Sequence, residues 1–117
     1  MTIKIKSKVR RMPALRRGRT IRLRTTNARI TQNLGGGFRR HILQNAIIPA
    51  EGRMTVELEA VGTTRKVVSA GWSLTGGFDP EVFSTENFPF TDSVWRIVIW
   101  NDTSVPRTIT PYLITKR

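Results

Sequence analysis

The segment RMTVELEAV, residues 53–61, decides the fold class, because apolar and polar side chains alternate along it. One side of the segment carries Met54, Val56, Leu58 and Ala60, and the other carries Thr55, Glu57 and Glu59. Such alternation predicts a half-buried antiparallel strand with one face on a core. The two acids on the polar side could form a carboxylate pair, but a solvated strand face is the simpler interpretation.

Three further segments predict strands. RKVVSAGWSLTGG, residues 65–77, places Val68, Ala70, Trp72 and Leu74 on one face. SVWRIVIWND, residues 93–102, is apolar on both sides, which predicts a central strand covered twice. RTITPYLITKR, residues 107–117, contains a proline that removes a ladder donor, so an edge position or a bulge is expected. The turn residues NDTSVP between the last two strands predict that they form one hairpin.

The segment GGFDPEVFSTENFPFTD, residues 76–92, has no periodicity and is rich in phenylalanine. Its aromatic residues are Phe78, Phe83, Phe88 and Phe90. We expect a long surface loop whose rings either pack on the protein's own core or contact a neighbouring subunit.

Positive charge is concentrated at the start of the chain. The 117 residues carry a net charge of +12, yet the first acid is Glu51. The leading cations are Lys4, Lys6, Lys8, Arg10, Arg11, Arg16, Arg17, Arg19, Arg22 and Arg24. TIKIKSK (residues 2–8) and RTIRLRT (residues 19–25) alternate, which predicts strands with one apolar and one cationic face, able to join another sheet.

Together these patterns predict an all-β protein with about six to eight short strands. The expected architecture is an antiparallel β-sandwich or a small jelly-roll-like barrel with an extended basic N-terminal arm. The arm covers residues 1–37 and ends in a glycine-rich joint, and the β-sandwich body covers residues 38–117.

Residues suited to catalysis or metal binding are scarce. The chain has no cysteine, and its single histidine, His41, has no acid near it in sequence, so a surface or packed side chain is expected. NLGGGFRRH, residues 33–41, lacks the Gly-Lys-Ser/Thr ending of a phosphate-binding loop and is interpreted as a flexible joint. We therefore expect no enzyme activity, cofactor or metal. No apolar run reaches the length of a membrane span, and no membrane partner is expected.

The cationic arm can bind a polyanion by releasing counterions. It has no aromatic ring between Met1 and Gly37, however, and recognition of single strands favours rings interleaved with cations. This argues against a protein dedicated to recognising nucleic acid. The remaining candidate partners are an acidic protein surface and the phosphate backbone of a nucleic acid.

A resemblance follows from VVSAGWSLTGGFDPEVFSTE and VWRIVIWNDTSVPRTITPYLITKR, which together span most of residues 67–117. A strand with a small-aromatic-small centre, a variable loop, a Trp-led strand ending in Asn-Asp and a closing strand with Thr-Pro-Tyr resemble small β-sandwich virion proteins of tailed bacteriophages, such as head decoration or cement proteins. The resemblance implies an oligomeric, non-enzymatic role in the virion. The basic arm departs from many such modules.

The leading hypothesis is a viral structural protein that clamps or decorates the capsid. The ten leading cations would dock on the major capsid protein or other acidic virion subunits, and Phe78, Phe83, Phe88 and Phe90 would contact a sister copy in a homo-oligomer. Two alternatives stay open: a small coat protein whose arm binds nucleic acid, and a tail or connector component.

Overall fold

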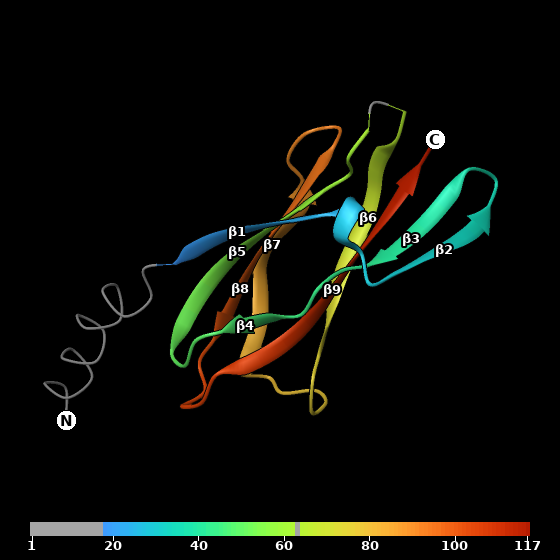
Figure 1. Ribbon diagram of the computed structural model, residues 1–117. Helices are drawn as coiled ribbons and strands as arrows, with labels where there is room; N and C mark the ends of the chain where they lie inside the picture. Colours follow the sequence, from blue (N-terminus) through green and yellow to red (C-terminus); the bar gives the residue numbers. More distant parts are fainter. Residues whose placement is uncertain (1–17, 63) are drawn as a thin grey trace, which may run out of the picture.

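The computed structural model describes residues 18–62 and 64–117, and strands form most of this part of the chain (Figure 1). A short 3-10 turn, Thr25–Asn27, follows the first strand. The strands are β1 (Arg19–Arg24), β2 (Ile30–Gly35), β3 (Phe38–Ile42), β4 (Ala46–Ile48), β5 (Gly52–Glu59), β6 (Lys66–Leu74), β7 (Val82–Pro89), β8 (Val94–Asn101) and β9 (Arg107–Lys116).

The strands form two packed sheets, as predicted for a β-sandwich. Sheet A has the order β1-β5-β8-β7, and sheet B has the order β2-β3-β9-β4, with β6 also pairing with β9. Every pair is antiparallel except β1 and β5, which run parallel. The all-β prediction is therefore confirmed, and the antiparallel description is corrected for this one pair.

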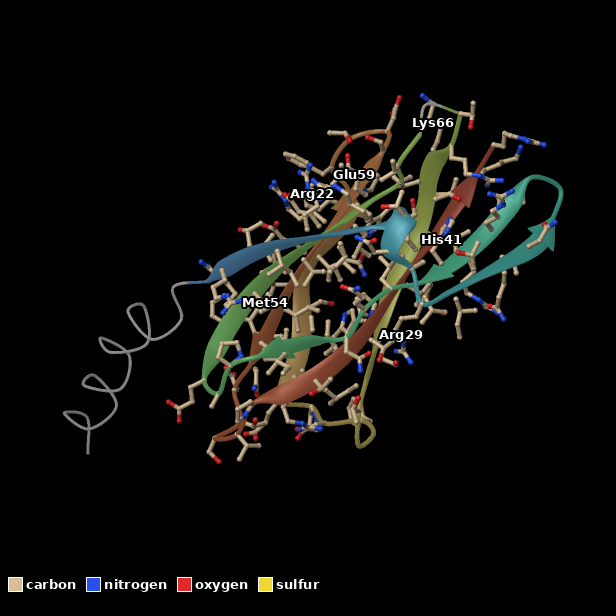
Figure 2. All side chains as sticks on the ribbon, viewed as in Figure 1. Arg22, Arg29, His41, Met54, Glu59 and Lys66 are labelled. Atoms are coloured by element: carbon tan, nitrogen blue, oxygen red, sulfur yellow. The ribbon has the colours of Figure 1, made fainter. Side chains whose placement is uncertain are left out.

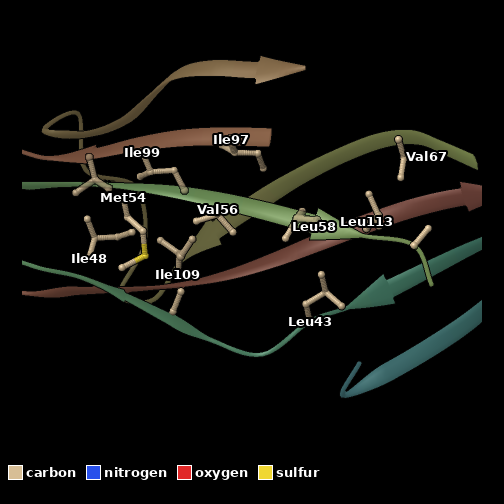
Figure 3. Packing of buried hydrophobic residues seen from close by; sticks show 13 residues of the cluster. Leu43, Ile48, Met54, Val56, Leu58, Val67, Ile97, Ile99, Ile109 and Leu113 are labelled. Carbon is tan, nitrogen blue, oxygen red and sulfur yellow. The ribbon is translucent and has the colours of Figure 1, made fainter. Parts of the chain in front are cut away.

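The core lies between the two sheets and follows the alternation seen in the sequence (Figure 3). Met54, Val56 and Leu58 of β5 are buried, and they face Ile109 and Leu113 of β9 in the opposite sheet. Each such aliphatic side chain stabilises the fold by about 1.5–3 kcal/mol when it leaves water. The period-two pattern of residues 53–61 thus marks the side of β5 that builds the core.

The predicted hairpin of the last two strands is wrong, because β8 belongs to sheet A and β9 to sheet B. Asn101, at the end of β8, is fully buried and donates hydrogen bonds to the carbonyl oxygens of Ile48, Pro49 and Val105 at 2.9–3.1 Å. These bonds hold the connection in place as it crosses from one sheet to the other. The second face of β8 is half-buried instead of fully covered.

The edge position predicted for residues 107–117 is also wrong. Strand β9 has β3 and β4 along one edge and β6 along the other, so it lies inside sheet B. Pro111 is tolerated there because β3 ends at Ile42 and β4 begins only at Ala46. The Leu43 amide donates to the Pro111 carbonyl at 2.9 Å, so the proline's missing donor faces this gap between two ladders.

Two β-bulges explain the remaining differences between the prediction and the structure within residues 38–117. A register shift between Val67 and Ser69 makes Val67 buried and leaves Val68 42% exposed, the reverse of the predicted face. A second shift, between Ser84 and Glu86, interrupts β7. Residues 82–89 are thus an edge strand, not a loop, and the bulge removes the alternation that would have revealed it.

The described part of the predicted arm belongs to the two sheets. Ile21 and Leu23 of β1 pack against the core, as the alternation of RTIRLRT predicts. The boundary predicted after residue 37 falls within the β2–β3 hairpin, whose turn contains Gly35, Gly36 and Gly37 at φ of 86°, 64° and 88°. These glycines form a tight turn and not a joint, since a left-handed backbone favours glycine. TIKIKSK lies outside the described residues.

Candidate functional site

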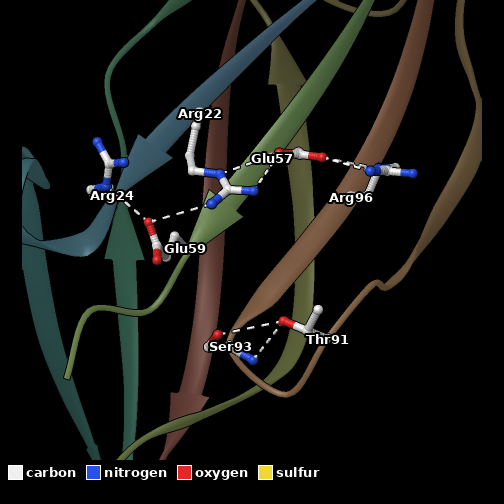
Figure 4. A network of polar contacts seen from close by, with 7 residues as sticks. All are labelled: Arg22, Arg24, Glu57, Glu59, Thr91, Ser93 and Arg96. Atoms are coloured by element: carbon white, nitrogen blue, oxygen red, sulfur yellow. Dashed lines mark hydrogen bonds and ion pairs between the residues drawn. The ribbon is translucent and has the colours of Figure 1, made fainter. Parts of the chain in front are cut away.

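A chain of charged side chains crosses the outer face of sheet A (Figure 4). Glu57 of β5 accepts hydrogen bonds from Arg22 of β1 on one carboxylate oxygen and from Arg96 of β8 on the other, with shortest distances of 2.7 Å each. Glu59 accepts a bond from Arg24 at 2.8 Å. The register places each partner directly across the sheet, so the three strands are joined by their side chains as well as their backbones.

Glu57 is only 7% exposed, which corrects the solvated strand face expected from the sequence. The hydrogen bonds from Arg22 and Arg96 outweigh the effect of burial and lower the pKa of Glu57 below its usual value. The hydrogen bond to Glu57 also raises the pKa of Arg22. Both side chains therefore stay charged near neutral pH, and the pair acts as a structural link between strands.

The ten cations predicted to bind a partner fall into three groups. Arg22 and Arg24 are paired inside the protein with Glu57 and Glu59, and Glu57 is shared with Arg96. Arg19 begins β1 and is exposed. The other seven lie outside the described residues: Lys4, Lys6, Lys8, Arg10, Arg11, Arg16 and Arg17.

The four phenylalanines predicted to contact a sister copy separate into two pairs. The Phe90 ring lies 3.6 Å from the Arg96 guanidinium carbon, and it meets Phe88 edge-on with 6.3 Å between ring centroids. These two rings therefore lie next to Arg96, at one end of the row of charged side chains on sheet A. Phe78 and Phe83 lie elsewhere, at the side of the sandwich where β6 and β7 run along its margin.

A groove opens between β6 and β7, with a volume of about 620 Å³. Its apolar lining includes Trp72 and Leu74 of β6, Val82 of β7, and the rings of Phe78 and Phe83. Phe78 is 92% exposed. An apolar groove beside an edge strand is a surface suited to contact with another chain.

His41 is packed, which is one of the two environments predicted for it. It is 5% exposed, and its Nε2 and Nδ1 lie 3.0 Å and 3.4 Å from the hydroxyls of Thr115 and Thr31. Burial, and then the charges of Arg65 and Arg39, lower the pKa of His41. The ring is therefore neutral near pH 7 and is held between β2 and β9, as its position in Figure 2 indicates.

Across residues 18–62 and 64–117, no group of three or more His, Asp or Glu side chains could hold a metal ion. Within that same part of the chain, no helix is long and apolar enough to cross a membrane.

Comparison with protein families identifies a match to YjdH over residues 19–115. The chain belongs to the YjdH family. The match begins at the first residue of β1 and ends in β9, so it spans both sheets and includes β1 with them. No curated protein and no solved structure matches the chain.

Proposed function

We propose that this protein is a non-enzymatic structural subunit of a virion that decorates or clamps the capsid. In this role its leading cations dock on acidic neighbouring subunits, and its β6–β7 margin contacts a sister copy. A tail or connector component would use the same surfaces.

The observation that carries the proposal is the apolar groove between β6 and β7 with the exposed Phe78 beside it. The polar networks of the described residues are already used to join strands, as with Glu57 and Asn101. The groove, by contrast, presents apolar surface that no strand within residues 18–62 and 64–117 covers. Repeated contacts of this type give strong attachment in a symmetric assembly through avidity.

The cationic segment supplies the second contact. Because Arg22 and Arg24 are already paired within sheet A, docking relies on Arg19 and on the cations of residues 1–17. This narrows the part of the chain that an experiment should remove.

A deletion of residues 1–17 tests the docking contact, since it stops before β1 and leaves the Arg22–Glu57 pair in place. We expect the shortened protein to melt cooperatively, and to lose co-sedimentation with capsids formed by a capsid protein encoded beside this gene. Undiminished co-sedimentation would contradict docking through this segment. Absence of any capsid gene nearby would count against the virion role itself.

Contact between copies is tested with the double variant Phe78→Ser/Phe83→Ser. Its molar mass is measured by light scattering as it elutes from a size-exclusion column. We expect the double variant to dissociate to monomers. Phe88→Ser is the matched control, because its ring packs on Phe90 within the same molecule. Equal effects of the two changes would contradict a contact centred on the groove.

A further inference from the structure

The β2–β3 hairpin and the end of β9 extend beyond the core (Figure 1). Three arginines belong to this end of sheet B, one on β3, one before β6 and one after β9. Arg39 lies directly across from Thr115 in the β3–β9 ladder, and Arg117 follows two residues later on the same face. Arg65, before β6, donates from Nη1 to the Thr115 hydroxyl at 3.3 Å and to the Gly37 carbonyl at 3.0 Å. The Arg117 amide donates to the same Gly37 carbonyl at 3.0 Å.

No Asp or Glu side chain forms an ion pair with this group within residues 18–62 and 64–117, and the terminal oxygen of Arg117 accepts from Lys116 Nζ at 3.3 Å. Glu59, at the end of β5, and Asp92, before β8, are each paired with a different cation, Arg24 and Lys66. Arg39 and Arg117 are exposed. Like charges held together in this way destabilise the free protein, and a ligand of opposite charge relieves the repulsion.

We propose that Arg39, Arg65 and Arg117 form a binding site for phosphate groups. Guanidinium groups match the oxygens of phosphate with paired, charge-assisted hydrogen bonds. The charges of Arg39 and Arg117 both act on Arg65, and three neighbouring cations suit a single multiply charged oxyanion better than separate carboxylates. The phosphate belongs either to a nucleic-acid strand or to free inorganic phosphate. The site is independent of the docking and groove contacts proposed above.

His41 can report on occupancy of the site, because it is the single histidine of the chain and, like Arg65, contacts the Thr115 hydroxyl. Thr31 of β2 and Thr115 of β9 contact its ring, and Arg39 and Arg65 are the charges acting on it. A bound dianion offsets those two charges. The pKa of His41 therefore rises toward its ordinary value when the site is occupied.

The first experiment follows the His41 ring signals by NMR on the full chain during pH titrations, with added sulfate and with chloride at equal ionic strength. Sulfate serves as the dianion because it does not itself titrate in this range. We expect sulfate to raise the pKa of His41 and to shift the Nε signals of Arg39, Arg65 and Arg117 to saturation. Shifts no larger than those of Arg40, or equal shifts in chloride, would overturn the site.

The second experiment measures binding of a labelled twelve-nucleotide single strand by fluorescence anisotropy over a salt series. The double variant Arg39→Gln/Arg117→Gln removes two phosphate contacts, and we expect it to bind the strand about tenfold more weakly. The slope of log K against log[salt] should become less steep by about 1.4, at roughly 0.7 per phosphate contact. The matched control is Arg40→Gln combined with Arg29→Gln. Arg40 is the next residue along β3, on the opposite face of the sheet, where it bonds Gln32, and Arg29 bonds Asn45.

The arms of this experiment separate the two sources of phosphate. Inorganic phosphate and tripolyphosphate compete with the strand if free phosphate is the ligand, whereas a strand that binds far more tightly than either identifies nucleic acid. Equal effects of the site variant and the control variant would overturn the proposal. Arginine shifts that depend on protein concentration alone would also overturn it, and would indicate carboxylates of a second copy instead.

Discussion

Replacement of Glu57 by glutamine tests the charged chain of sheet A most directly. The change keeps the size of the side chain but leaves Arg22 and Arg96 facing each other without the carboxylate that receives both. Loss of one partner from a fully buried pair costs about 3–5 kcal/mol, and exposed pairs contribute about 0–1 kcal/mol. Since the side chain of Glu57 is 9% exposed and those of the two arginines 39% and 28%, we expect an intermediate loss of about 2–3 kcal/mol in the free energy of unfolding.

The assay is thermal and urea unfolding followed by circular dichroism. A loss of this size lowers Tm by roughly 10 °C, at about 4 °C per kcal/mol for a domain of this length. Glu59→Gln is the matched control, because Glu59 lies on the same face of the same strand but is paired mainly with the exposed Arg24. We expect it to lower stability by about 0.5 kcal/mol.

The pH dependence gives the sign of the effect. The pKa of Glu57 is lower in the folded protein than in the unfolded chain, so its contribution is complete above the unfolded value. As pH falls below about 4.3, the wild-type protein loses this contribution and approaches the Glu57→Gln variant. A difference between the two that stays constant from pH 7 to pH 3, or equal losses for Glu57→Gln and Glu59→Gln, would refute the reasoning.

Three other substitutions test contacts seen only in the structure. Gly71→Ala places a Cβ 2.7 Å from the Tyr112 ring, and we expect a loss of about 1–3 kcal/mol by urea unfolding, largely restored when Tyr112→Ser is added. Asn101→Ala leaves three carbonyl oxygens without their donor, and we expect it to cost about 2–3 kcal/mol, whereas Asn87→Ala on the exposed β7 should cost far less. Pro111→Val adds a buried amide that faces the gap between β3 and β4, where no ladder supplies an acceptor, and we expect a loss of about 1–3 kcal/mol by urea unfolding.

Much of the fold was predictable from local patterns. The alternation in residues 53–61 identified β5 and its core-facing side, and the alternation in residues 19–25 identified β1. The apolar character of residues 94–100 correctly indicated a strand inside a sheet. Such signals are local because side chains of a strand point alternately to its two faces, whatever the strand pairs with.

The candidate site was less predictable. Arg22 and Arg24 were correctly placed on one strand face, but no local pattern indicated that Glu57 and Glu59 would lie beside them. The arginines of the proposed phosphate site come from residues 39, 65 and 117, which are far apart in sequence. The Arg-Arg pair before His41 was the one available signal, and the missing information was the β3–β9 register.

Sequence alone determined that five segments are strands, which faces of two of them are apolar and where charge accumulates, since each depends on neighbouring residues. The five are β1, β5, β6, β8 and β9, and the two faces are those of β1 and β5. Only the tertiary structure decided which strands pair and in which direction. The partners of β1 and β9 depend on contacts between distant segments, and the buried Asn101 directs the chain to the second sheet where the turn residues alone predicted a hairpin. Burial of Glu57 and the accommodation of Pro111 follow from that pairing, because both depend on which groups the neighbouring strands bring alongside them.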